Sequence, residues 1–162
     1  MRTLFIIPLV LMSLVSCPSW SLDLKDLVVR AGLFYEKFTS TPFTGEVDEG
    51  LFRGSIKNGK QHGSSEYYHE NGQLLFKGNF KNGKSEGIFE YYHDNGQLSA
   101  KGNLEDGERE GVWEIYHKNG QLKSRGDYKN GKKNWTWKSY FPDGTIDHEN
   151  TGKYKNDVKV SD

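Results

Sequence analysis

The sequence predicts an all-β protein, an antiparallel β-hairpin meander of 24-residue repeats that forms an elongated, single-layer twisted sheet. The 162 residues include 19 glycines, and 14% of them are aromatic, a composition that suits short strands and tight turns. Each repeat contains two Asn-Gly or Asp-Gly dipeptides, the strongest local signal for a hairpin. At this length we expect one domain.

The repeat is visible when the sequence is aligned on its glycines. NGKQHGSSEYYHENGQLLFKGNFK begins at Asn58, NGKSEGIFEYYHDNGQLSAKGNLE at Asn82 and DGEREGVWEIYHKNGQLKSRGDYK at Asp106. A fourth copy begins at Asn130 and carries two extra residues near its end. A helical interpretation would place these glycines inside helices at about 1 kcal/mol each. We therefore expect hairpins that follow one another in one sheet.

Four segments follow from this pattern. Residues 1–21 resemble an export signal, because a basic residue precedes an apolar run too short to cross a membrane, and small residues follow it. Residues 22–57 are expected to form an N-terminal arm or short helix and degenerate capping strands. Residues 58–157 form the repeat array, and residues 158–162 form a C-terminal tail. Atypical end units protect the open edges of such an array.

Two processing routes fit the signal segment. Ser19 and Ser21 provide the small residues for cleavage before Leu22, whereas residues 14–17 resemble a bacterial lipobox that would lipidate Cys17. We favour ordinary secretion because Pro18 would directly follow the lipidated cysteine; a buried N-terminal helix is a third alternative. The protein is thus expected in the periplasm or medium, or as a membrane-anchored lipoprotein if Cys17 is lipidated. Cys17 is the only cysteine, so no intramolecular disulfide and no cysteine-based metal cluster can form.

Strand pairing can be counted outward from each turn if the loops contain two residues. His93 then faces Leu98 around one turn, and Phe76 faces Phe89 around the other. One face of the sheet collects the apolar side chains, with rings expected over the facing glycines Gly78, Gly87, Gly102 and Gly111. The apolar set is Leu74, Phe76, Phe80, Phe89, Tyr91, Leu98, Leu104, Trp113, Ile115, Leu122, Tyr128 and Trp137.

The opposite face carries a tyrosine column and charges that alternate across the strands. The tyrosines are Tyr68, Tyr92, Tyr116 and Tyr140. The expected cross-strand pairs are Glu66 with Lys77, Glu90 with Lys101, Glu114 with Arg125 and, with the signs exchanged, Lys138 with Glu149. Exposed pairs contribute only about 0–1 kcal/mol each. We interpret them as determinants of register and solubility rather than as catalytic carboxylates.

The sequence gives little indication of catalysis or metal binding. His69 and His93 lie two strands apart, roughly 10 Å, whereas zinc needs ligand nitrogens about 2.0–2.1 Å from the metal. Phe141 occupies this position in the fourth copy, so we interpret the histidines as flat rings beside turns, with a metal or pH-sensing role as the alternative. Nucleophile, P-loop and dinucleotide motifs are missing from the sequence. The 22 basic and 22 acidic residues cancel, which argues against nucleic acid as a partner.

The recurring pattern G-x-W/F-x-x-Y-x-x-N-G-Q-L resembles MORN-type repeats (membrane occupation and recognition nexus) over residues 32–157. The bacterial YwqK-like members, which the leader RAGLFYEKFTSTPFTGEV also resembles, are commonly labelled toxin-antitoxin system antitoxin. The resemblance implies a binding or scaffolding module, with an antitoxin or immunity factor as a special case. Asn134 and Trp135 depart from the pattern, since a glycine is expected there.

We therefore expect an exported, non-enzymatic protein that binds a protein partner and holds no metal or cofactor. Its apolar face must curl on itself, be covered by residues 22–45, or be covered by the partner. The candidate binding residues are Phe89, Trp113 and Trp137 on the apolar face and Tyr68, Tyr92, Tyr116 and Tyr140 on the other. Binding of a membrane surface or wall polysaccharide of the cell envelope is the alternative; a hydrolase is less favoured. Both columns could also serve packing alone.

Overall fold

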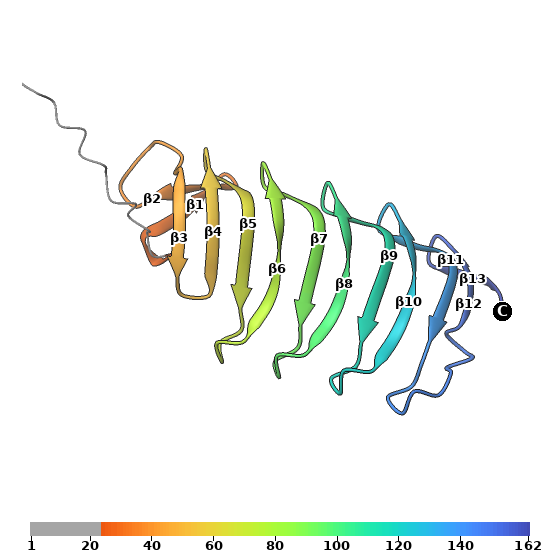
Figure 1. Cartoon of the computed structure of the whole chain (residues 1–162). Coiled ribbons are helices and arrows are strands. Elements are labelled where there is room, and N and C mark those ends of the chain that lie inside the picture. Colours follow the sequence, from red (N-terminus) through yellow and green to blue (C-terminus); the bar gives the residue numbers. More distant parts are fainter. Residues whose placement is uncertain (1–23) are drawn as a thin grey trace, which may run out of the picture.

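The computed structural model describes residues 24–162, which form an open 11-stranded antiparallel sheet and a separate two-stranded hairpin (Figure 1). This confirms the predicted fold class. One turn of 3-10 helix, η1 (Leu24–Asp26), leads into the hairpin of β1 (Leu27–Arg30) and β2 (Leu33–Glu36). The large sheet contains β3 (Gly45–Glu49), β4 (Phe52–Lys57), β5 (Lys60–Tyr68), β6 (Leu74–Lys81), β7 (Lys84–Tyr92), β8 (Leu98–Glu105), β9 (Glu108–Tyr116), β10 (Leu122–Lys129), β11 (Lys132–Ser139), β12 (Gly152–Lys155) and β13 (Val158–Ser161).

The strands of the large sheet lie in chain order from β3 to β13, so each pairs with its neighbours in the sequence. Both ends differ from the expectation. Leu27–Arg30 is a strand rather than a helix or arm, and residues 158–162, expected to be a tail, contain strand β13. The export segment and Cys17 lie outside the described residues. Within residues 24–162 no helix has the length and apolar character needed to cross a membrane.

Two kinds of turn alternate along the sheet. At Asn82-Gly83 the flanking Lys81 and Lys84 pair directly, and both central residues have positive φ, 53° and 84°, as a type I′ turn requires. The turn at Asn95-Gly96 is longer, since Tyr92 rather than His93 pairs with Leu98. The expectation of a two-residue loop is therefore wrong at this kind of turn. The Asn95 side chain accepts the Gln97 backbone N–H at 3.1 Å, an Asx turn that needs the extra residues.

Each repeat contains two bulges, and because of them the observed register differs from the predicted one. Between Lys77 and Asn79 the register shifts by two residues, so Phe76 faces Tyr91 and not Phe89. A two-residue shift leaves every side chain on its predicted face. After the longer turn the shift is one residue, between Tyr91 and Tyr92, and a one-residue shift exchanges the faces. The leucines that follow this turn therefore lie on the opposite face from the one predicted.

The core consists of aromatic rings laid against glycines of the preceding strand. A Cβ atom on Gly102 would lie 2.2 Å from the Trp113 ring, and one on Gly126 would lie 2.3 Å from the Trp137 ring. Gly78 meets Phe89 in the same way. The prediction of rings over glycines is thus right at Gly78 and Gly102. It is wrong at the other two expected positions, Gly87 and Gly111, where no ring approaches and φ is positive.

The bulge and the ring support each other. The Trp113 indole N–H donates to the Asn103 carbonyl at 3.0 Å, where the ladder with β9 shifts register. The bulge frees this carbonyl from the ladder, and the indole satisfies it. Above the rings, the Arg109 guanidinium lies 4.5 Å from the Trp113 centroid and the Lys133 ammonium 4.5 Å from that of Trp137. The sheet thereby covers its own aromatic face.

Residues before the repeats cover a second, smaller core. Leu27, Phe34 and Phe43 pack against a buried group on β3 and β4 that consists of Val47, Phe52 and Ile56. Two of the three expected ways to cover the apolar face therefore occur. The repeats curl on themselves, and the leader covers only the first strands.

Gly102→Ala tests the contact between ring and glycine. Alanine normally stabilises a strand relative to glycine by roughly 0.5–1 kcal/mol, but here its Cβ must displace a rigid, buried indole. We expect a loss of about 1–3 kcal/mol in the free energy of unfolding, measured by urea denaturation. Lys101→Ala on the same strand should cost less than about 1 kcal/mol. Equal stability of the Gly102→Ala variant and the parent would contradict this account of the core.

Candidate functional site

The outer face of the sheet, opposite the aromatic core, carries cross-strand pairs of tyrosine and leucine. Each pair joins the end of one strand to the start of the next, and an isolated bridge extends the row into the fourth repeat. The pairs are Tyr68 with Leu74, Tyr92 with Leu98, Tyr116 with Leu122, and Tyr140 with Ile146. Paired side chains lie on the same face of a sheet. Hence the three leucines belong with the tyrosine column and not, as predicted, with the core rings.

The tyrosine rings of the first three repeats are held in place by glutamates of their own strand. The hydroxyl of Tyr92 donates to Glu90 at 2.9 Å, and that of Tyr116 donates to Glu114 at 2.9 Å. Tyr68 and Glu66 repeat the contact. All four tyrosines are half-buried. The result is a row of partly exposed, pre-ordered aromatic rings, with Arg53 over the ring of Tyr68 and Lys77 over that of Tyr92.

Basic and acidic side chains alternate beside this row. The cross-strand pairs are Arg53–Glu66, Glu66–Lys77, Lys77–Glu90, Glu90–Lys101, Lys101–Glu114 and Glu114–Arg125. The three pairings predicted for the first three repeats are confirmed. Lys138 faces Arg125 instead of the expected Glu149, because the segment after Tyr140 forms a turn in which Asp147 accepts hydrogen bonds from Asn150.

Glu90 is the best-connected carboxylate of this ladder. The ammonium groups of Lys77 and Lys101 each lie 2.9 Å from its oxygens. Lys77, then Lys101 and the Tyr92 hydroxyl, lower the pKa of Glu90 to about 2. Burial and the neighbouring Glu90 raise the pKa of Tyr92. Carboxylates so tied to lysines are poor general acids, since they stay ionised at neutral pH.

The histidine column joins neighbouring repeats. The Nε2 atoms of His69, His93 and His117 lie 3.2, 3.0 and 2.9 Å from the backbone carbonyl oxygens of Tyr92, Tyr116 and Tyr140. Asn71 and Asn95 also donate to carbonyls of the next loop, at 2.7 and 2.8 Å. These rings lie beside turns, as the structural interpretation predicts. Within residues 24–162 no group of three or more potential ligands gathers for a metal ion.

The candidate residues of the apolar face are not available at the surface. Phe89 is 1% exposed, and Trp113 and Trp137 are 0% exposed. They pack within the chain's own core, with Leu104 and Tyr128. Of the two predicted columns, only the tyrosines can therefore touch a partner while the fold is intact.

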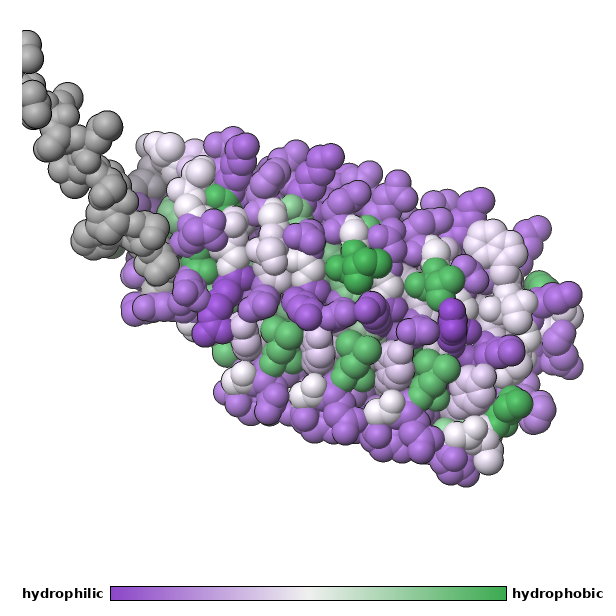
Figure 2. Space-filling view, viewed as in Figure 1, coloured by the Kyte–Doolittle hydropathy of each residue, from purple (hydrophilic) through white to green (hydrophobic). Residues whose placement is uncertain are grey.

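Exposed aliphatic side chains accompany the outer row. Ile88 is 55% exposed and Val112 48%. Figure 2 shows apolar residues recurring in two rows along one face, with a band of hydrophilic residues between the rows. The exposed apolar side chains therefore form extended rows rather than one cluster.

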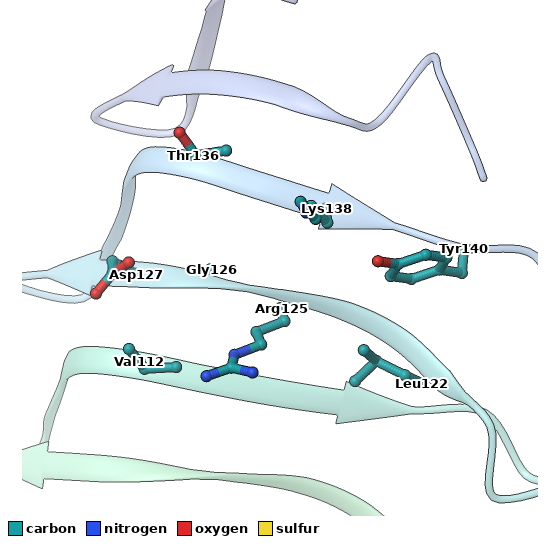
Figure 3. A pocket seen from close by; sticks show the side chains of 8 residues that line it. All are labelled: Val112, Leu122, Arg125, Gly126, Asp127, Thr136, Lys138 and Tyr140. Atoms are coloured by element: carbon teal, nitrogen blue, oxygen red, sulfur yellow. The ribbon is translucent and has the colours of Figure 1, made fainter.

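A shallow depression of about 400 Å³ lies where the row reaches the fourth repeat (Figure 3). Leu122 and Val112 form apolar parts of its lining, and Arg125, Lys138 and Tyr140 bring polar groups into it. Sequence reasoning did not single out Lys138 as a site residue, because the expected pairing with Glu149 would have neutralised it.

Comparison with known proteins supports the repeat assignment. Residues 61–82, 85–106 and 109–130 match the family model described as MORN repeat variant. The three matched segments cover the hairpins that build the outer row from Tyr68 to Leu122. No curated protein matches the chain.

Glu90→Gln tests the charge ladder. The lowered pKa of Glu90 means that its stabilisation is present above the ordinary value of 4.5 and disappears as the pH falls toward 2. We expect the variant to be less stable than the parent by up to about 1 kcal/mol at pH 6, since the pair is partly exposed. Urea unfolding should show this difference shrinking between pH 4.5 and 2.

Ile88→Ala replaces an uncharged side chain on the same strand and serves as the control. Its stability difference from the parent should stay constant over the same pH range. A Glu90→Gln difference that is equally independent of pH would mean that the ladder contributes nothing to stability.

Proposed function

We propose that the protein is an exported, non-enzymatic repeat protein that acts as a protein-binding or scaffolding module through its outer face. MORN repeats generally serve as protein- or membrane-binding modules and are generally non-catalytic. The observation that carries the proposal is the row of tyrosine–leucine pairs, which runs without interruption from Tyr68 to Ile146.

Two physical properties suit this row to binding. The rings of the opposite face are buried in the core, so within the repeats the outer face is the one whose aromatic and apolar side chains remain accessible to a partner. The hydroxyl contacts with Glu90 and Glu114 hold the rings of Tyr92 and Tyr116 in the free protein, which lowers the entropy lost when a partner orders them. Tyrosine also combines apolar area with a polar tip, the usual property of interface residues.

A polypeptide is the partner that this surface fits best. The row extends over four repeats and is bordered by charges of both signs, as a protein partner with apolar and charged side chains requires. An antitoxin or immunity role, as the YwqK-like resemblance implies, is a special case of such binding. A cytoplasmic toxin fits poorly with an export segment, so we propose a partner in the cell envelope.

Photo-crosslinking tests the proposed surface. A photoreactive phenylalanine analogue at Leu98, on the row, should crosslink to one protein in the native envelope, whereas the same analogue at Lys84, at the start of β7 beside a turn, should not. Tyr92→Ala combined with Tyr116→Ala should weaken binding of that protein at least about tenfold while the unfolding curve stays cooperative. Lys84→Ala combined with Asp106→Ala is the matched control and should bind normally.

Two outcomes would count against this function. Equal crosslinking from both positions would mean that the row is not the contact surface. Sedimentation of the protein with vesicles or wall sacculi, with no crosslinked protein, would establish the envelope-polymer alternative instead.

Export by ordinary secretion makes a separate prediction. We propose cleavage after Ser21, so Edman sequencing of the mature protein should begin at Leu22, and Cys17→Ser should leave processing and location unchanged. Two results would show instead that the protein is a lipoprotein. The mature parent protein would begin with a lipid-modified Cys17, and the Cys17→Ser variant would be retained in the cytoplasm.

A further inference from the structure

The fourth repeat breaks the charge ladder at one place. From Arg53 to Arg125 each acidic side chain lies between two basic ones. The next position along the ladder, equivalent to Glu66, Glu90 and Glu114, is Lys138. Lys138 pairs with Arg125, so two like charges lie directly opposite each other, an arrangement that destabilises a sheet.

Among residues 24–162, no carboxylate compensates this pair fully. Arg125 reaches Glu114 at 3.6 Å, at the edge of the ion-pair range, and Glu114 also faces Lys101. Within residues 24–162 Lys138 forms no ion pair. Asp127 lines the same depression, and its pairing partner on β11 is Asn134 rather than Lys138.

Tyr140, the tyrosine of the fourth repeat, does not have the glutamate acceptor of the other three tyrosines. Tyr68, Tyr92 and Tyr116 each donate a hydroxyl proton to the glutamate two residues earlier. The residue two before Tyr140 is Lys138. Figure 3 shows the Tyr140 hydroxyl directed along the depression toward Lys138, with Arg125 on the neighbouring strand.

We propose that this depression binds a carboxylate of an acidic side chain from the docked polypeptide. The carboxylate supplies the acceptor that Glu66, Glu90 and Glu114 supply in the other repeats, and it accepts from Arg125, Lys138 and Tyr140. Charge-assisted bonds of this kind are about twice as strong as neutral ones. Leu122 and Val112 contact the aliphatic part of the side chain and its neighbours.

The geometry favours a carboxylate over a phosphate group. Asp127 lines the depression, and Glu114 lies 3.6 Å from Arg125; this negative charge penalises a dianion more than a monoanion. The depression is also shallow and continuous with the tyrosine–leucine row, so an extended peptide can place one side chain in it. The inference rests on the proposed function in that the row supplies the rest of the contact.

Peptide binding measured by NMR tests the inference on the intact mature protein. The probe is acetyl-Thr-Val-Glu-Val-Thr-amide, and its matched control replaces Glu with Gln. The Glu peptide should bind about tenfold more tightly and shift the amide signals of Arg125, Lys138 and Tyr140. Added salt should weaken its binding. Equal affinities of the two peptides would overturn the proposal.

Lys138→Glu is the decisive variant because it restores the pattern of the other repeats. It should abolish the preference for the Glu peptide and raise the melting temperature by about 2–4 °C, since a like-charge pair becomes an ion pair. Lys81→Glu makes the same change in net charge on β6 and should leave the preference intact. A preference that survives Lys138→Glu would overturn the proposal.

Inorganic phosphate and acetate distinguish the two anion types at the same site. Acetate should shift the three signals at lower concentration than phosphate, and tighter binding of phosphate would overturn the carboxylate assignment. These small probes need no partner protein. If acetate does not bind, the carboxylate site is wrong, but the tyrosine–leucine row can still be a binding surface. If the crosslinking experiment fails, the row is wrong, but the local carboxylate site can still exist.

Discussion

A ring laid flat on the glycine of the preceding strand is the contact on which this sheet depends. A single-layer sheet has no second layer to cover its apolar face, and a side chain at Gly78, Gly102 or Gly126 would hold the facing ring away from the backbone. Large aromatic side chains bury about 150–250 Å² each, or about 4–6 kcal/mol before entropy losses. Each repeat thus obtains its core from its neighbour, so the unit of stability is a pair of adjacent hairpins.

A two-residue register shift accompanies this contact in three ladders of the sheet. To lie across Gly102, the Trp113 indole needs an acceptor for its N–H, and the register shift provides the Asn103 carbonyl. The shift in turn needs a residue with positive φ, which is Gly87 in the second repeat and Gly111 in the third. In the first repeat Ser65 on β5 stands where the later repeats have the ring. The facing Gly54 on β4 is approached instead by the ring of Phe52 from its own strand.

The sequence was sufficient to predict the fold class, the hairpins and the alternating charges, because these follow from a strict 24-residue period and from turn dipeptides. It was not sufficient to place Leu98, because one extra residue in a bulge after the longer turn reverses the face of the strand end without any change in the repeat. The sequence was also not sufficient to predict that Trp113 and Trp137 are fully buried. Alternation shows that a face is apolar, but not whether the sheet curves enough to cover it.

The structure restricts the candidate site to the outer face, because the predicted residues of the other face are buried, and strand β11 carries two departures from the repeat. Trp135 lies where the other repeats have glycine, with φ of 56° and 55% of its surface exposed. That backbone conformation is costly for a bulky residue, and burial does not offset the cost. The Lys129 ammonium lies 5.9 Å from the ring centroid. Lys138 on the same strand adds an unfavourable like-charge pair. Folding alone would favour the glycine and the glutamate that the other repeats carry at these two positions. Two unfavourable departures at the surface of one strand therefore support the proposal that β11 contributes to binding.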